Sequence, residues 1–126
     1  MLPFTIQFTS GIPVYEQVVF AVKKAVMAGR LLPGENFPSV RQLSQELRIN
    51  PNTAQKIISA LTAEGILEVY PGRGTVIASG PATNGEQKKK FLDQEVEKLV
   101  VEAGHCQITL AELLRAVERQ WTRLKR

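Results

Sequence analysis

The chain has 126 residues, of which 44% are hydrophobic, a net charge of +4 and one cysteine. This length suggests one domain, or a small domain with an extension, and the apolar content is too high for a disordered chain. No apolar run approaches the roughly 20 residues that span a bilayer. With neither a recognisable signal peptide nor a possible internal disulfide, we expect a cytoplasmic protein with no membrane partner.

The basic excess is spread over the chain. Residues 1–80 contain 7 Lys/Arg and 5 Asp/Glu, whereas residues 81–126 contain 9 and 7, so each part carries +2. A polyanionic partner is plausible for such a chain. Global charge does not establish one, so an assignment to DNA depends on where particular residues lie.

The first expected helix covers residues 14–28. Its apolar residues recur at three- and four-residue spacing, which predicts one buried face. Pro13 suits the start of a helix, and Gly29 suits the position after its end. The apolar residues are Tyr15, Val18, Val19, Val22, Ala25 and Val26. A short extended piece with a turn at Pro33 and Gly34 should follow.

A second helix should begin at Ser39. A capping box is expected there, in which Ser39 accepts from the N–H of Gln42 and the Gln42 side chain returns to the N–H of Ser39. Val40, Leu43 and Leu47 form the inner face, and Arg41 and Arg48 lie elsewhere on the surface. The residues "RIN" then break the helix.

A third helix follows at once. Asn50 is a good N-cap, Pro51 suits the first helical position and Gly65 closes the helix. The apolar face consists of Ala54, Ile57, Ile58 and Leu61, and the polar side presents Asn52, Thr53, Gln55, Lys56 and Ser59. Two short helices joined by a tight break predict a helix-turn-helix, whose second helix lies in the major groove of DNA.

Two strands, "ILEVY" and "TVIA", are joined by "PGRG" and predict a hairpin, which after a helix-turn-helix is a wing. Gly72 and Gly74 do not form a dinucleotide-binding fingerprint, because Ile77 occupies the place of its third glycine and a strand follows instead of a helix. Arg73, at the tip, gains nothing obvious for folding. We therefore expect it to enter or border the minor groove.

The composition changes after Ala78. Residues 79–87 resemble a linker. A helix is expected over residues 88–103, with Leu92, Val96, Leu99 and Ala103 on one side and Gly104 after its end. A last helix starts from a capping box of Thr109 and Glu112, and its apolar residues are Leu110, Leu113, Leu114, Val117, Trp121 and Leu124. Two such helices cannot bury their apolar faces alone. They must pack on the first domain or on a second copy, and we favour self-association.

Enzymatic and metal chemistry find no support in the sequence. The one histidine and the one cysteine are adjacent, His105 and Cys106, and too few to form a usual zinc site. No Ser/His/Asp, Cys/His or paired-carboxylate arrangement stands out. We therefore expect no catalytic residue, no cofactor and no bound metal.

Residues 11–78 resemble the winged helix-turn-helix domain of GntR-type bacterial transcription regulators, most clearly in "AGRLLPGENFPSVRQLS", "NPNTAQKIISALTAEG" and "GRGT". The short tail is similar to that of the YtrA-type subfamily, whose members lack a large effector domain, dimerise through the tail and often regulate transporter operons. The resemblance implies a mainly α fold with a small β-hairpin wing. It also implies a DNA-binding domain over residues 1–79 and a linker with a two-helix dimerisation region over 80–126.

The resemblance assigns a DNA contact to Arg41, base reading to the start of the third helix, and close approach of the wing to its two glycines. With the phosphate contact expected of Arg48, the candidate DNA-binding residues are Ser39, Arg41, Arg48, Asn52, Thr53, Gln55, Lys56, Gly72, Arg73 and Gly74. Many relatives have arginine where this chain has Pro51 and Gln55, so a relative's operator cannot simply be copied.

These residues and the resemblance together predict a homodimeric repressor that binds a palindromic DNA operator. The alternative hypothesis is a winged-helix module that binds proteins and not DNA. Arg41, Lys56 and Arg73 on one surface favour DNA, because a protein-binding version has little need of all three. The operator, the regulated genes, any small-molecule effector and the choice between repression and activation stay open at this stage.

Overall fold

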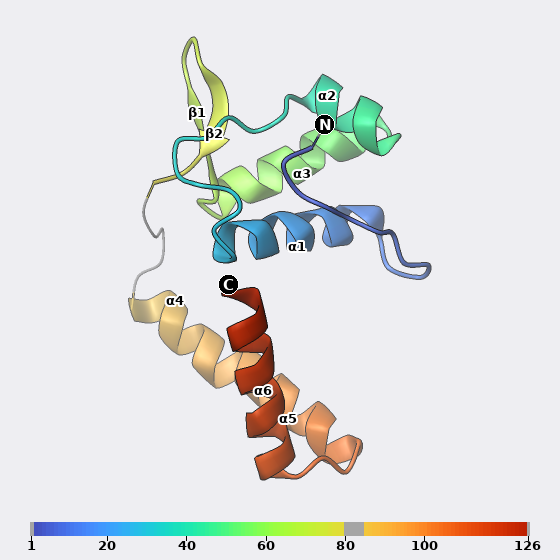
Figure 1. Ribbon diagram of the computed structural model, residues 1–126, viewed down its shortest axis with the longest axis vertical. Helices are drawn as coiled ribbons and strands as arrows, with labels where there is room; N and C mark the ends of the chain where they lie inside the picture. The colour runs from blue at the N-terminus through green and yellow to red at the C-terminus, as the bar shows by residue number, and fades with distance from the viewer. Residues whose placement is uncertain (1, 80–84, 126) are drawn as a thin grey trace. The chain divides into compact units, whose positions relative to one another are not determined.

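Figure 1 shows the computed structural model, which describes residues 2–79 and 85–125. The chain forms two compact units, an N-terminal unit, Met1–Ala82, and a C-terminal unit, Thr83–Arg126. Within the described ranges the protein is mainly helical, with one two-stranded antiparallel sheet. The predicted fold class, α-helical with a small β-hairpin wing, is therefore confirmed. None of the described helices is long and apolar enough to cross a membrane.

Helix α1 covers Val14–Met27, close to its predicted range. Its buried residues are Val18, Val19, Val22 and Ala25. Tyr15 and Val26, which were predicted on the same face, are half-buried and pack against the edge of the core. After Ala28 the chain turns at Gly29, as expected from a glycine in this place.

Helices α2, Val40–Leu47, and α3, Pro51–Ala63, form the predicted helix-turn-helix. The N–H of Asn52 donates to Oδ1 of Asn50 at 2.7 Å, so the predicted cap of α3 is confirmed. At α2 the N–H of Gln42 donates to Oγ of Ser39 at 3.1 Å. The predicted return bond from Gln42 is wrong, because its side chain is hydrogen-bonded to Glu46, one helical turn further on.

The break between α2 and α3 depends on the backbone of Arg48. This residue has φ 55° and ψ 48°, in the left-handed region that glycine usually occupies at a helix end. Its N–H donates to the carbonyl of Ser44 and closes α2. The chain can then leave α2 and start α3 only three residues later.

The wing consists of β1, Leu67–Tyr70, and β2, Gly74–Ile77, paired from Leu67 opposite Ile77 to Tyr70 opposite Gly74. Gly72 and Gly74 both have φ above +80°, which the tight tip requires. An additional bridge, not predicted, joins Asn36 to Val76. Hydrogen bonds from Phe37 N–H to Thr75 O and from Ile77 N–H to Glu35 O bind the segment before α2 to the wing.

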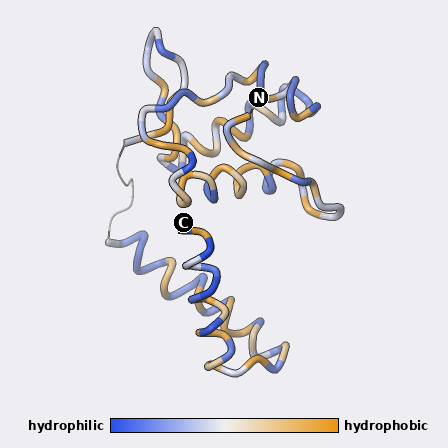
Figure 2. Tube along the Cα trace, viewed as in Figure 1, coloured by the Kyte–Doolittle hydropathy of each residue, from blue (hydrophilic) through white to orange (hydrophobic). Residues whose placement is uncertain are grey.

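One core holds the N-terminal unit together. In Figure 2, polar and apolar residues alternate along its helices with the period expected of helices that bury one face. The core joins α1, α2, α3 and the base of the wing, and it includes Phe4 and Phe37, whose rings stack at 6.1 Å between centroids. Its most enclosed side chains are Val18, Val22, Leu31, Leu43, Ile57, Leu61, Leu67 and Ile77. This packing fixes the outer faces of α2 and α3.

The C-terminal unit contains a long helix made of α4, Gly85–Lys90, a π-helical turn η1, Phe91–Glu95, and α5, Val96–His105. The predicted range of 88–103 is too short. The helix begins inside the predicted linker, and it runs through Gly104 instead of ending there. The left-handed residue after its end is Gln107, with φ 60°. Residues 80–84 of the predicted linker lie outside the described residues.

Helix α6 covers Leu110–Leu124. Its predicted capping box is confirmed in both directions. The N–H of Glu112 donates to Oγ1 of Thr109 at 3.2 Å, and the N–H of Thr109 donates to Oε1 of Glu112 at 2.9 Å. The backbone N–H of Thr109, and to a smaller extent its side chain, hold the pKa of the Glu112 carboxyl below its ordinary value, because they favour the charged carboxylate.

Candidate nucleic-acid interface

The outer face of α3 presents a polar row at its N-terminal end. Asn52, Gln55 and Lys56 are exposed and Thr53 is half-buried, while the opposite face of the helix is locked into the core. Nε2 of Gln55 donates to Oγ of Ser59 at 3.0 Å, which leaves the amide oxygen of Gln55 pointing outward as an acceptor. A row of short polar side chains on a rigid helix is suited to contact with base edges.

Lys56 has a partner that the sequence did not indicate. Its Nζ lies 4.5 Å from the centroid of the Tyr15 ring, in a cation–π contact between α3 and α1. Tyr15 was assigned a packing role, and its half-buried ring does pack against the core. The contact with Lys56 is additional, and it holds the ammonium group beside α3 instead of leaving it free on its flexible chain.

A hollow of about 490 Å³ lies between the start of α2, α3 and the wing. It brings together four of the predicted site residues, Ser39, Gln55, Arg73 and Gly74. Asn36 and Gln42 also line it and were not among the candidates. The place of Asn36 depends on the unpredicted bridge to the wing, and Gln42 lies in the first turn of α2. The other six candidates, Arg41, Arg48, Asn52, Thr53, Lys56 and Gly72, do not line this hollow.

Arg73 is exposed at the tip of the wing, yet its guanidinium group is folded back. Nη2 donates to the carbonyl of Gly34 at 3.3 Å, and the group lies 5.9 Å from the centroid of the Tyr70 ring. The expectation that Arg73 gains nothing for folding is therefore wrong, because it joins the wing tip to the turn before α2. Both contacts are at the surface, where an anion can replace them at little cost.

Three further features affect the charge and the hydrogen-bonding groups of the wing and of α2. The hydroxyl of Tyr70 donates to the carboxylate of Glu68, and this hydrogen bond raises the pKa of Tyr70 above its ordinary value. Arg41 and Arg48 are exposed on and after α2, and neither takes part in an ion pair among the described residues. Ser39 uses its oxygen as an acceptor for the cap, which leaves the hydroxyl hydrogen available to donate.

The predicted dimerisation residues of the C-terminal unit are mostly exposed. Leu92, Leu110 and Trp121 keep 65%, 70% and 60% of their surface accessible. Val96, Leu99, Leu114 and Val117 are exposed as well, and Leu113 and Leu124 are half-buried. Within the described part of this unit, Ala103 is the one buried apolar residue. The two helices thus contact each other over a narrow strip and leave a broad apolar surface uncovered.

Among the described residues there is no group of three or more His, Cys, Asp or Glu side chains that could hold a metal ion. Cys106 is a free, exposed thiol in the turn before α6. The arrangement that the structure does offer is a hollow bordered by part of a polar helix face and by the wing tip with its cation, Arg73. Arg41, Arg48 and Lys56 are exposed outside this hollow.

Comparison with known proteins finds a family match over residues 14–77, which include α1, the helix-turn-helix and the wing. These residues match the family described as bacterial regulatory proteins, gntR family. The chain is 34% identical over 105 residues to the HTH-type transcriptional repressor YtrA of Bacillus subtilis, covering 82% of this chain and 81% of that protein.

Solved structures agree in fold. A transcriptional antiterminator from Listeria monocytogenes EGD-e superposes with a TM-score of 0.85 at 24% identity, covering 98% of this chain and 92% of that one. A DNA-binding domain described as AraR(DBD) in complex with operator ORR3 has a TM-score of 0.50 at 27% identity, covering 59% of this chain and 89% of that one.

Proposed function

Because the chain belongs to the gntR family of bacterial regulatory proteins, which are DNA-binding transcription regulators and not enzymes, we propose that it is a repressor that binds a palindromic operator as a homodimer. The observation that carries this proposal is the hollow in which Ser39, Gln55 and Arg73 meet. It joins a capped helix start, a polar helix face and a wing-tip cation, which together match the surface of a DNA duplex. The similar protein from Bacillus subtilis is named a repressor.

In the proposed complex α3 lies in the major groove. Asn52, Thr53 and Gln55 face the base edges, and a Gln amide suits the paired donor and acceptor of adenine. Lys56 contacts guanine or a phosphate, depending on how far its ammonium moves from the Tyr15 ring. These side chains determine which sequence is bound.

The helix α2 supplies phosphate contacts. The Ser39 hydroxyl donates to one phosphate, and the exposed guanidinium groups of Arg41 and Arg48 attract others. Such contacts carry no sequence information, but they set the position and orientation of α3 on the duplex.

The wing contacts the neighbouring minor groove. Gly72 and Gly74 allow the backbone of the tip to approach the duplex, since neither has a side chain in the way. Arg73 exchanges its weak surface contact with the Gly34 carbonyl for the negative potential of the groove.

Dimerisation is assigned to residues 80–126. Many apolar side chains of α5 and α6 are exposed, among them Trp121 in the last turn of α6, and exposed apolar surface of this kind marks an interaction site. A second copy would cover this surface with an identical one, in the two-fold arrangement that a palindromic operator requires. We further propose that the operator controls a transporter operon, and that the protein acts in the cytoplasm at the nucleoid.

The test is selection of bound duplexes from fragmented genomic DNA of the source organism, followed by affinity titration over a range of salt concentrations. Enrichment of an inverted repeat, with affinity that falls steeply as salt rises, is the expected result. The doubly substituted chain Arg41→Ala, Arg73→Ala should fail to enrich it. Salt-sensitive binding with no enriched sequence would remove the operator from the proposal, and no binding to any duplex would favour the protein-binding module instead.

A further inference from the structure

The positive charge of the C-terminal unit is concentrated in its last part. Residues 81–105 contain 4 Lys/Arg and 5 Asp/Glu, a net charge of −1, whereas residues 106–126 contain 5 and 2, a net charge of +3. Of the two acidic residues in the second group, Glu112 is engaged in capping α6. Three of the five cations are arginines of α6, and the other two, Lys125 and Arg126, follow the helix in the sequence.

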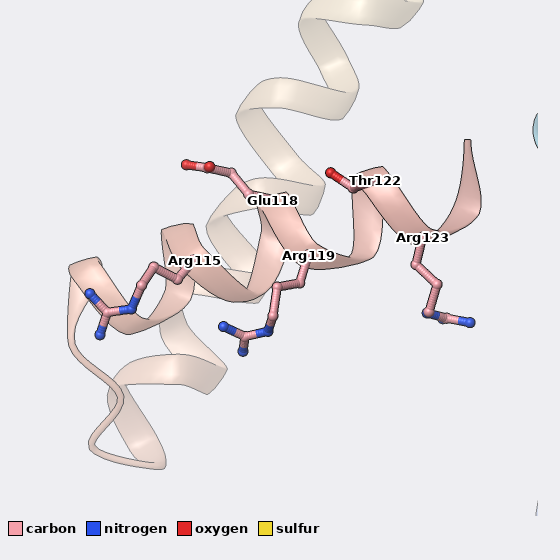
Figure 3. Close-up of a pocket in the computed structure, with 5 residues that line it drawn as sticks. All are labelled: Arg115, Glu118, Arg119, Thr122 and Arg123. Carbon is pink, nitrogen blue, oxygen red and sulfur yellow. The ribbon is translucent and has the colours of Figure 1, made fainter. Parts of the chain in front are cut away.

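The three arginines of α6 form one row. Arg115, Arg119 and Arg123 are spaced by four residues, so they lie on one face of α6 with a rise of about 6 Å from each to the next. Figure 3 shows all three extending to the same side of the helix, while Glu118 and Thr122 extend to the other. The five residues together border a shallow hollow of about 580 Å³.

The three arginines form no ion pair among the described residues, and Glu118 is the one carboxylate that borders the same hollow. Arg123 donates through Nε and Nη2 to Oε1 of Gln120, at 3.2 and 2.6 Å, which fixes the group without cancelling its charge. Three adjacent guanidinium groups repel one another, and this repulsion is relieved when an anion binds between them.

The proposed dimer surface does not use this row. Val117 and Trp121 each lie two residues from an arginine of the row, which places them about 200° away around the helix. A partner copy seated on Trp121 would therefore leave the arginines in solvent. Acidic residues of the second copy would therefore not be placed to pair with the three arginines.

We propose that Arg115, Arg119 and Arg123 form a second DNA-binding surface, which contacts backbone phosphates outside the part of the operator that α3 and the wing occupy. The inference rests on the proposed function. Guanidinium groups suit phosphate because they donate in pairs, and a DNA strand offers charges at regular spacing. The row spans about 12 Å, which exceeds the reach of a small anion but matches several phosphates along a duplex.

The test compares the unaltered chain with the variant Arg115→Gln, Arg119→Gln, Arg123→Gln on two forms of the duplex enriched from genomic DNA. One form is trimmed to the segment that α3 and the wing protect from cleavage, and the other extends beyond it at both ends. The unaltered chain should bind the extended form more tightly. The variant should lose this gain, about tenfold in affinity at low salt, and its slope of log K against log salt should fall by about 0.9 for each phosphate contact removed.

The matched control removes the same number of charges from α4, as Lys88→Gln, Lys89→Gln, Lys90→Gln, and should retain the gain. Equal loss in both variants would show a general charge effect and overturn the proposal. Unchanged affinity and slope in the arginine variant would overturn it while leaving the operator-binding function intact. If that variant sediments as a monomer, the row contacts a second copy and the proposal is also wrong. Absence of binding by the unaltered chain would instead refute the proposed function itself.

Discussion

In the N-terminal unit the side chains of Leu43, Ile57 and Leu61 are completely enclosed, whereas in the C-terminal unit Leu92, Leu110 and Trp121 keep 60% or more of their surface exposed. Both units are built largely from amphipathic helices. The difference is that α1, α2 and α3 cover one another and the base of the wing, while within the C-terminal unit the apolar side chains of α5 and α6 are mostly exposed. The first unit can therefore fold by its own contacts, and the stability of the second depends on what covers its apolar surface.

The largest expected difference between the units comes from shortening a leucine in each. Leu61→Ala removes a fully buried side chain and should lower the free energy of unfolding by about 3 kcal/mol. Leu110→Ala removes an exposed one and should leave the unfolding of the N-terminal unit unchanged. Urea denaturation of both variants measures the contrast. Equal destabilisation of that unit would mean that the two units do not fold separately.

The second prediction concerns assembly. Trp121→Glu places a charge in the proposed dimer surface and should raise the dimer dissociation constant about thirtyfold, equivalent to about 2 kcal/mol. The matched control is Thr122→Glu, which adds the same charge about 100° around α6 from Trp121. Sedimentation at several concentrations gives the mass. An unaltered mass for Trp121→Glu would refute the assignment of this surface to a second copy.

A change on the outer face of the N-terminal unit should affect binding without affecting stability or mass. Arg41→Ala should weaken binding to all duplexes about tenfold and reduce the salt slope by about 0.9, because one phosphate contact is lost. Arg30→Ala, an exposed arginine after α1, is the control of equal charge. If the loss is confined to one base position, Arg41 reads sequence and its assignment to phosphate is wrong.

The cap of α6 provides a smaller effect, in the other unit. Thr109→Ala removes one of the two capping bonds and should destabilise the helix by about 1 kcal/mol. The pKa of Glu112 is lowered in the folded chain, so the contribution of its carboxylate is complete above the ordinary pKa of glutamate and disappears as pH falls through the lowered value. Thermal unfolding of the unaltered chain and of Glu112→Gln should therefore differ at pH 7 and converge in acid. A constant difference would exclude the capping role.

The smallest effect is expected between Tyr15 and Lys56. Tyr15→Leu removes the ring beneath the ammonium and should change operator affinity about threefold, or about 0.6 kcal/mol, while Tyr15→Phe should have almost no effect. In a chain that already carries Lys56→Ala, the Tyr15→Leu change should have no further effect on operator affinity. If it keeps its full effect there, Tyr15 acts through packing alone and not through Lys56.

The sequence predicts best what neighbouring residues determine. The cap of Asn50 on Asn52 and the pair of Thr109 and Glu112 join residues two or three positions apart, and both were correct. The same local reasoning failed where two local partners compete, because Gln42 bonds to Glu46 and not back to Ser39. It also failed at Gly104, which is the second-last residue of α5 instead of the residue after its end.

Contacts between distant parts of the chain were not predictable in this way. The bridge of Asn36 to Val76, the bond of Arg73 to Gly34 and the position of Lys56 over Tyr15 depend on how whole elements pack. Sequence therefore identified most members of the candidate site, which lie on recognisable helices and a hairpin. It did not identify how Asn36 and Gln42 join them around one hollow.

The π-helical turn at Phe91–Glu95 has a consequence for changes in the length of the chain. A π turn holds one residue more than an α turn, so one residue could be deleted there while α4 and α5 keep their orientation. A deletion within α5 itself would rotate everything before it by about 100° and move Leu92 off the apolar side. If the gene loses a single codon, this turn is the part of the long helix of the C-terminal unit in which the loss leaves the surfaces of α4 and α5 aligned.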